Sequence, residues 1–184
     1  HGVMMGRIVI GTADKEGESG GEIPDYGSIN YVDRVSCKDI VAYLPDGITT
    51  HYPVGFDNFQ FSTFNSQLLK RVVLLDCGVK ANIIRNLLKR NVAVIRVPWN
   101  YDFNGLEFDG LFISNGPGNP DTCDAAVQNI RKAMKNEKLP IFGICMGNQL
   151  LSKAGGAKIY KLKYGHRSHN QPVRMVGTER CFIT

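Results

Sequence analysis

Short apolar runs alternate with segments of helical periodicity from residue 71 to residue 154. The runs are continuous, which is typical of strands buried on both faces. They predict four strands, at Val72–Leu75, Val92–Val97, Leu111–Ser114 and Ile141–Ile144. Apolar residues at helical spacing predict three helices, near Ile83–Leu88, Ala125–Met134 and Asn148–Ala154. This alternation indicates an α/β fold in which helices cover both faces of a parallel sheet.

Residues 1–69 lack this alternation, and we expect them to be the tail of a small domain followed by a connector. Val3–Ile10 is strand-like, and Tyr31–Tyr43 fits either a short helix or a strand. Asp46-Gly47 indicates a turn, with a hairpin as one interpretation. The expected domains are therefore 1–69 and 70–184.

The C-terminal residues have a different pattern again. Lys158–Tyr164 alternates like a strand, and the polar stretch Gly165–Pro172 predicts a loop. Val173–Thr184 predicts two short strands around Gly177.

The fourth apolar run leads into Gly143-Ile144-Cys145-Met146-Gly147 and then into the third helix. A strand that turns sharply into a helix through Gly-x-nucleophile-x-Gly is a nucleophile elbow. The start of a helix favours an anion, so we expect it to favour the thiolate form of a cysteine placed there. A cysteine more often fills a core, but the two glycines and the flanking strand and helix favour a nucleophile.

In a parallel sheet, ligands bind outside the carboxyl ends of the strands. Asp76-Cys77-Gly78, Ser114–Gly118 and Cys145 all fall at such ends, so we expect them to share one crevice. A thiolate that attacks a carbonyl there needs two donors for the oxyanion. The backbone N–H of Met146 supplies one and that of Gly118 the other, although a plain tight turn is the alternative interpretation of the Gly118 loop.

The composition is ordinary for a globular protein, with 43% hydrophobic and 21% charged residues among 184. The apolar runs are too short for a transmembrane helix, so we expect no membrane association. The net charge is +5. No nucleic-acid-binding motif accompanies the basic residues, so we expect no nucleic-acid partner, and a solvated or protein-docking face fits better. The densest basic cluster is Lys158, Lys161, Lys163, His166 and Arg167.

The cysteines are odd in number and widely spaced, which predicts no metal site and a reducing, cytoplasmic compartment. They are Cys37, Cys77, Cys123, Cys145 and Cys181.

Asn115–Pro120 followed by Gly143–Gln149 resembles the paired motifs of the class I glutamine amidotransferases. Three flanking stretches, His1–Ile10, Asp76–Ile83 and Lys163–Pro172, are similar to the small subunit, or glutaminase region, of carbamoyl-phosphate synthetase. They look closest to the eukaryotic multifunctional form of the pyrimidine pathway; the arginine pathway is left open. The resemblance implies a three-layer flavodoxin-like sheet at 70–184, incomplete at its C-terminus. It also implies part of a small N-terminal α/β domain at 1–69.

The resemblance also implies roles for individual residues. Cys145 is the implied nucleophile that converts glutamine to a glutamyl thioester and frees ammonia. Met146 and Gly118 are the implied oxyanion hole, and Gly116 and Gln149 the implied glutamine-binding residues. The partner is a carbamoyl-phosphate synthetase large subunit or fused synthetase domain. ATP, bicarbonate and magnesium or potassium belong to that partner, so no cofactor is expected in this chain.

Two departures from the family pattern limit this expectation. Asn148 stands where many relatives carry His, and we assign it no catalytic role. The resemblance implies that the catalytic His and Glu of the family lie beyond Thr184, in a His-Pro-Glu-like segment. We do not expect the histidines present to take that role. We therefore expect this stretch to be part of a longer chain and to hydrolyse glutamine very poorly by itself. The histidines are His1, His51, His166 and His169.

The sequence is also compatible with other functions. One alternative is a different thiol hydrolase, such as a Cys-type esterase of the α/β-hydrolase kind. Another is a docking and regulatory subunit with a vestigial elbow. The glutaminase subunits of anthranilate and GMP synthetases carry similar motifs but lack a region matching His1–Leu69.

Overall fold

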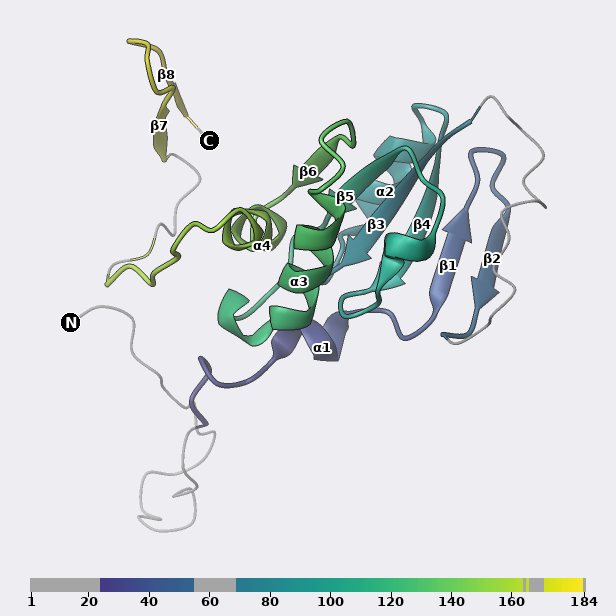
Figure 1. The fold of residues 1–184 in the computed structure, drawn as a ribbon, viewed down its shortest axis with the longest axis horizontal. Coiled ribbons are helices and arrows are strands. Elements are labelled where there is room, and N and C mark those ends of the chain that lie inside the picture. Colours follow the sequence, from purple (N-terminus) through teal and green to yellow (C-terminus); the bar gives the residue numbers. More distant parts are fainter. Residues whose placement is uncertain (1–23, 55–68, 164, 166–170, 184) are drawn as a thin grey trace, which may run out of the picture. The chain divides into compact units, whose positions relative to one another are not determined.

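A computed structural model describes residues 24–54, 69–163, 165 and 171–183 (Figure 1). Asp25–Ile159 forms one compact unit, and the residues from Tyr160 onward belong to a second. The strand expected at Val3–Ile10 lies outside the described residues. In the described ranges, no helix is long and apolar enough to cross a bilayer.

The first unit is built on a six-stranded sheet with the strand order β2-β1-β4-β3-β5-β6. Strands β3, β4, β5 and β6 run parallel to one another, as the apolar runs predict. The chain crosses from β3 to β4 on one side and then returns to β5 on the other side of β3. The strands are β1 Ile40–Tyr43, β2 Thr49–Tyr52, β3 Lys70–Asp76, β4 Val92–Pro98, β5 Gly110–Ile113 and β6 Ile141–Gly143.

This reversal makes the carboxyl ends of β3 and β5 a topological switch point, where open α/β sheets bind ligands. The connection after β3 begins at Cys77, and the connection after β5 begins at Ser114. The connection after β6 lies next to that of β5. The three loops predicted to share a crevice therefore follow three neighbouring strands.

Helices cover both faces of the sheet, which confirms the α/β prediction (Figure 1). On one face, α2 packs Ile84 and Leu87 against Leu74 and Val94 of the central strands. On the other face, α3 and α4 cover a larger core. The helices are α1 Tyr31–Val35, α2 Ala81–Leu88, α3 Asp124–Ala133 and α4 Met146–Ala154, with short 3-10 turns η2 Phe103–Gly105 and η3 Pro120–Thr122.

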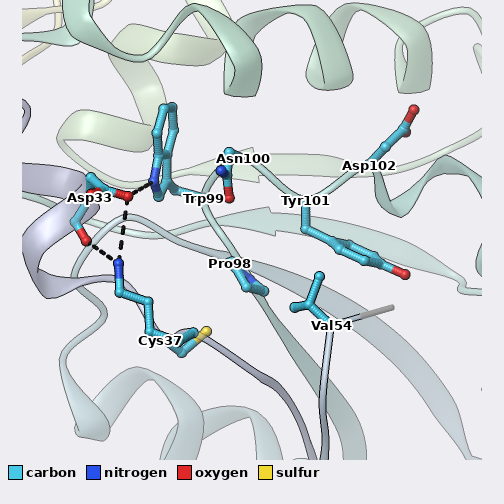
Figure 2. A pocket seen from close by; sticks show the side chains of 9 residues that line it. Asp33, Cys37, Val54, Pro98, Trp99, Asn100, Tyr101 and Asp102 are labelled. Atoms are coloured by element: carbon cyan, nitrogen blue, oxygen red, sulfur yellow. Dashed lines mark hydrogen bonds and ion pairs between the residues drawn. The ribbon is translucent and has the colours of Figure 1, made fainter. Parts of the chain in front are cut away.

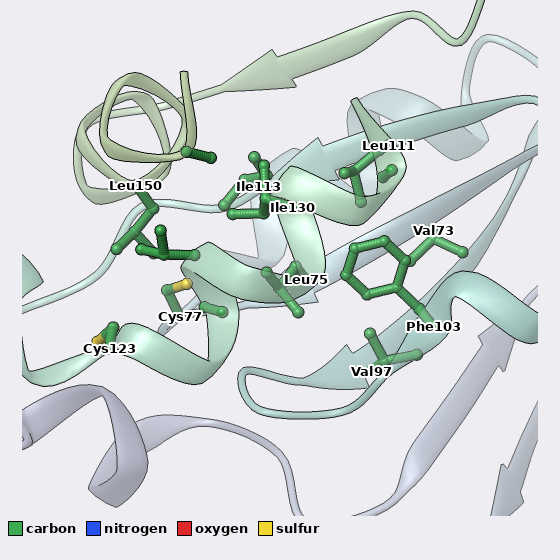
Figure 3. Close-up of a cluster of buried hydrophobic side chains, with 14 of the residues drawn as sticks. Val73, Leu75, Cys77, Val97, Phe103, Leu111, Ile113, Cys123, Ile130 and Leu150 are labelled. Atoms are coloured by element: carbon green, nitrogen blue, oxygen red, sulfur yellow. The ribbon is translucent and has the colours of Figure 1, made fainter. Parts of the chain in front are cut away.

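The larger core lies on the face of the sheet that α3 and α4 cover, and Figure 3 shows part of this cluster of buried side chains. Val73 and Leu75 alternate with Leu74 along β3, as the two-residue period of a strand between two layers requires. Phe103 of η2 is fully buried beside them. Burying a side chain of this size contributes roughly 1.5–3 kcal/mol.

The N-terminal segment supplies two strands to the same sheet. Asp46-Gly47 lies in the turn of an antiparallel β1–β2 hairpin, with Gly47 at φ 92°. Strand β1 then pairs antiparallel with β4. The boundary that we expect at residue 69 thus does not coincide with a break between compact units. The domain boundary at residue 69 stays a prediction.

The described residues of the second unit contain a small hairpin. Strands β7 (Pro172–Arg174) and β8 (Cys181–Ile183) are antiparallel, and Gly177 between them has a φ of 81°. This confirms the two short strands. The strand expected at Lys158–Tyr164 is wrong for residues 158–163, which form no ladder with another described strand. Most of the predicted loop at Gly165–Pro172 lies outside the described residues.

Candidate active site

Cys145 lies between β6 and α4 in a sharp turn, at φ 53° and ψ −107°. Within the described ranges, Asn91 is the one other non-glycine residue with a positive φ. A side chain at such a position costs about 1–3 kcal/mol, so the surrounding structure must hold it there. The thiol is exposed. The structure therefore has the strained turn and accessible sulfur that the elbow pattern predicts.

The two glycines of the elbow are required by close packing between strand, turn and helix. A Cβ atom on Gly143 would lie 2.6 Å from the carbonyl carbon of Gly147. A Cβ atom on Gly147 would collide with the carbonyl oxygen of Ile113 on the neighbouring strand β5. Any side chain at either position would push α4 away from the sheet and move Cys145.

The start of α4 presents backbone donors beside the thiol. Gly147 donates to the carbonyl of Ile144 (2.8 Å), and Gln149 donates to that of Cys145 (3.1 Å). The backbone N–H of Met146 donates to no acceptor in the described part of the chain. An N–H left unused beside a nucleophile is the first element of an oxyanion hole.

The loop after β5 carries the second predicted donor. Gly118 has a φ of 85°, a conformation that favours glycine. Its backbone N–H also has no acceptor among the residues that the structure describes. Gly116 lies so close to the carbonyl oxygen of Cys77 that a Cβ atom there would collide with it. The loops that follow β3 and β5 therefore touch, as expected from the switch point.

Two polar side chains that the sequence reasoning gave no role join these loops. The Ser114 hydroxyl, which is buried, accepts from the backbone N–H of Cys77 (2.9 Å) and donates to the carbonyl of Asn115 (2.9 Å). The Asn115 amide donates to the carbonyl of Gly78 (3.0 Å) and accepts from the backbone N–H of Lys80 (3.3 Å). The sequence signal that could have identified Ser114 and Asn115 is their position directly after the buried strand β5.

Asp76 is a third residue whose role the sequence reasoning missed. Its side chain is fully buried at the end of β3 and accepts two hydrogen bonds from Arg96 of β4, at 2.9 and 2.6 Å. It also accepts from the backbone N–H groups of Cys37 (2.7 Å), Gly78 (2.9 Å) and Val79 (2.8 Å). The sequence signal is one charged residue at each of two apolar runs, Asp76 directly after the first and Arg96 within the second, although the sequence does not show that the two residues pair.

The electrostatics of Asp76 follow from these contacts. Burial by itself would raise the pKa of the carboxyl group, but the N–H groups of Val79, Cys37 and Gly78 and the charge of Arg96 outweigh it. The pKa of Asp76 is therefore lower than usual, and the side chain is a carboxylate at neutral pH. It is placed to fix the first turn of the loop after β3.

The other cysteines differ from Cys145. Cys77 and Cys123 are buried in the core (Figure 3), and burial raises the pKa of each thiol. Burial also raises the pKa of Cys37 to about 12. These thiols are protonated at neutral pH and are poor nucleophiles. Cys181 is exposed, but it lies on β8 in the second unit.

The remaining predicted site residues are placed as follows. Gln149 lies on the first turn of α4 and is partly buried, whereas Asn148 beside it is exposed. His51 lies on β2, five strands away from β6. At about 4.8 Å per strand that is roughly 24 Å, too far for a general base. His1, His166 and His169 lie outside the described residues.

Three cavities lined by described residues do not include Cys145. One, of about 410 Å³, lies between α1 and the end of β4 (Figure 2). Its charged groups are already paired: Asp33 accepts from the Trp99 indole N–H (2.9 Å) and contacts Lys38 (3.5 Å). We assign it no ligand, but these contacts show how α1 is attached to β4.

Comparison with known proteins matches residues 73–184, more than half of the chain, to the family described as glutamine amidotransferase class-I. The chain belongs to this family. Its Gly-framed elbow and its Asn115–Pro120 loop are the motifs that led to this family from the sequence. The family assignment and the mostly parallel α/β sheet are therefore confirmed, while the roles of the individual residues stay predictions.

Relatives of this amidotransferase chain are named for carbamoyl phosphate synthesis or for multifunctional proteins. The multifunctional protein CAD of Squalus acanthias is 43% identical over 184 residues, which is 100% of this chain and 7% of the relative. The carbamoyl phosphate synthase small chain of Pyrococcus furiosus is 43% identical and matches 100% of this chain and 45% of the relative. The arginine-specific small chain of Saccharomyces cerevisiae is 42% identical, over 92% and 41% respectively. The chain thus spans less than half the length of each of these relatives.

A solved structure supports the fold. The crystal structure of a putative GMP synthase subunit from Thermoplasma acidophilum matches with a TM-score of 0.50 and 26% identity, over 57% of this chain and 54% of that one.

Proposed function

We propose that this chain is the glutaminase region of a glutamine-hydrolysing carbamoyl-phosphate synthetase. The observation that carries the proposal is the exposed, strained Cys145 at the start of α4 in a chain of the class-I amidotransferase family. Relatives that match the whole chain at 43% identity are named as a carbamoyl phosphate synthase small chain and as CAD. These names favour carbamoyl phosphate synthesis over other uses of ammonia.

In the proposed reaction, the Cys145 thiolate attacks the side-chain amide carbon of L-glutamine. A C–S bond forms, and the carbonyl oxygen becomes an oxyanion that accepts hydrogen bonds from the backbone N–H groups of Met146 and Gly118. Collapse of this intermediate breaks the C–N bond, and the nitrogen takes up a proton and leaves as ammonia. Water then hydrolyses the thioester to glutamate. The proton carrier is the His of the family, which we do not assign to any described residue.

The remaining parts of the proposal concern substrate and partners. Gln149, on the first turn of α4, and Gly116, in the loop after β5, are the proposed glutamine contacts. The ammonia passes to a synthetase large subunit or fused synthetase domain, which binds ATP, bicarbonate and magnesium or potassium. Five free cysteines fit a reducing compartment, and we place the reaction in the cytoplasm.

The test uses the complete protein together with its synthetase region. Cys145→Ser should abolish carbamoyl phosphate formation from glutamine while formation from ammonium ion continues, because only the release of ammonia needs the thiol. A glutamine-analogue chloroketone should label Cys145, as peptide mass spectrometry of the modified protein would show. Loss of both activities in Cys145→Ser, or turnover of aryl esters without labelling by the chloroketone, would contradict the proposal.

A further inference from the structure

The single helical turn α1 contacts both loops of the site. A Cβ atom built on Gly118 would lie 3.2 Å from Cβ and 3.5 Å from Cδ2 of Tyr31. A Cβ atom built on Gly78 would lie 2.9 Å from Cγ2 of Val35 and 3.1 Å from Cδ of Pro117. The side chains of α1 therefore pack directly onto the backbone of the loops after β3 and β5.

Helix α1 is held in place by contacts that do not involve Gly118. The Asn30 side chain caps it by accepting from the backbone N–H of Asp33 (2.9 Å), and its amide donates to the carbonyl of Thr122 (3.0 Å). Asp33 accepts from the indole of Trp99 at the end of β4 (2.9 Å) (Figure 2). The backbone N–H of Trp99 also donates to the hydroxyl of Ser36 (3.0 Å). The turn is thus anchored to β4 and to η3.

The ring of Tyr31 is itself held by contacts with two neighbouring side chains. It stacks on Tyr26 with centroids 4.3 Å apart and an angle of 24° between the planes. The guanidinium of Arg34 lies 5.4 Å from the ring centroid. Nearby, the Asn119 amide donates to the carbonyl of Gly27 (3.0 Å), which ties the segment before α1 to the residue that follows Gly118. The Tyr31 side chain therefore has a defined position, and Gly118 packs against it.

We propose that Tyr31 is a positioning residue that keeps the backbone N–H of Gly118 aimed at the oxyanion formed at Cys145. Glycine explores more backbone conformations than any other residue, and Gly118 needs an unusual one. Two residues earlier in the loop, Gly116 packs against the carbonyl of Cys77. The loop is therefore in contact with Tyr31 at Gly118 and with Cys77 at Gly116, and such fixed contacts give the preorganisation that an oxyanion hole requires.

The inference rests on the proposed glutaminase function and predicts a specific kinetic pattern. In the complete protein, Tyr31→Ala should lower kcat for glutamine hydrolysis by about 10- to 100-fold, because a donor displaced by about 1 Å loses most of its effect. KM should change by less than about twofold, since the donor acts mainly on the transition state. Tyr31→Phe keeps the ring and Cβ and should stay within about threefold of the native kcat.

A second measurement separates positioning from general structural damage. Iodoacetamide alkylates a thiolate by displacing iodide from carbon, and no oxyanion forms. The rate at which it modifies Cys145 should therefore be the same in Tyr31→Ala and in the native protein. Tyr31→Phe is the matched control, because it keeps the Cβ and ring carbons that face Gly118, and Cys145 in this variant should be alkylated at the native rate.

Each outcome decides the question. A native kcat in Tyr31→Ala overturns the inference. So does a parallel fall in kcat and in the alkylation rate, which would show that Tyr31 merely supports the fold. Failure of the native protein to release ammonia from glutamine would overturn the proposed function, and the inference with it.

Discussion

Two strand-to-helix turns at the same edge of the sheet each carry a cysteine, and they place it in opposite environments. In the turn after β3, Cys77 is fully buried, its thiol faces the core, and burial raises its pKa. In the turn after β6, Cys145 is exposed at a positive φ. Both turns precede a helix, so neither the residue type nor the helix start distinguishes them.

The difference lies in the backbone that surrounds each cysteine. Gly143 and Gly147 let the strand and helix of the β6 turn approach until the intervening residue is forced outward. In the β3 turn, the Asp76 carboxylate accepts hydrogen bonds from the backbone N–H groups of Gly78 and Val79. Cys77, which lies between Asp76 and Gly78 in the sequence, points into the core. One turn exposes its thiol, and the other holds the neighbouring loop in place.

The largest expected effect is on the reaction. Cys145→Ser should lower ammonia release from glutamine by about 10⁴-fold or more, because the nucleophile is lost. Cys77→Ala keeps the Cβ atom that Gly116 approaches and should lower the rate by no more than about threefold. Steady-state assays of the complete protein measure both. Equal losses in the two variants would mean that the turns do not differ in the way described.

The next effect is on stability. Gly147→Ala should reduce the free energy of unfolding by about 4 kcal/mol, because the new methyl group collides with the carbonyl of Ile113. Gly105→Ala is the control: a methyl group there meets nothing within 4 Å and should change stability by less than about 0.5 kcal/mol. Urea unfolding followed by circular dichroism measures the difference. Equal stabilities would show that the elbow is not tightly packed.

Asp76→Asn tests the inward-facing turn. It should cost about 3 kcal/mol at neutral pH, because Arg96 and the loop N–H groups lose a charged acceptor. The pKa of Asp76 is lowered by folding, so its contribution is complete above the unfolded-state pKa of about 3.9 and is lost as the pH falls through the folded-state pKa. The difference between variant and native protein should therefore shrink below about pH 4.

Unfolding curves between pH 7 and pH 3 measure this change. Asp39→Asn removes the charge of an exposed carboxylate two residues after Cys37, and it should show little effect at any of these pH values. A cost for Asp76→Asn that stays constant down to pH 3 would contradict the assigned pKa direction.

The smallest effect has the opposite sign. Cys145→Gly should raise the free energy of unfolding by about 1 kcal/mol, because glycine adopts a φ of 53° without strain. Cys145→Ala is the control, since it removes the sulfur but keeps the strained Cβ, and it should gain less. A less stable glycine variant would show that the turn is not strained. Lost activity together with gained stability is a common trade-off at functional sites.

The sequence was sufficient for the parts of the molecule that depend on local patterns. Continuous apolar runs located β3 to β6 within one or two residues of their ends, and the Gly-x-Cys-x-Gly frame located the turn at Cys145. These features are set by neighbouring residues and by the two-residue and helical periods. For the same reason, Asp46-Gly47 identified the hairpin turn.

The parts that failed depend on contacts between distant segments. Nothing near Ile40–Tyr43 indicates that this strand pairs with β4, some 50 residues later. Asp76 meets Arg96 only because their strands are neighbours in the sheet, and Tyr31 meets Gly118 only because α1 folds over that loop. Alternation at Lys158–Tyr164 was misleading, because a strand also needs a partner to pair with.

The pairing of β1 with β4 has a practical consequence for dissecting this protein. The match to the amidotransferase family starts at residue 73, yet the sheet begins at Ile40. A truncation designed on the family match would remove β1 and β2 and leave the N–H and C=O groups of β4 unpaired along one side. Such an open edge recruits strands from other molecules. Shortened versions of the protein that remain dispersed at high concentration should therefore start before Asp25 rather than after Leu69.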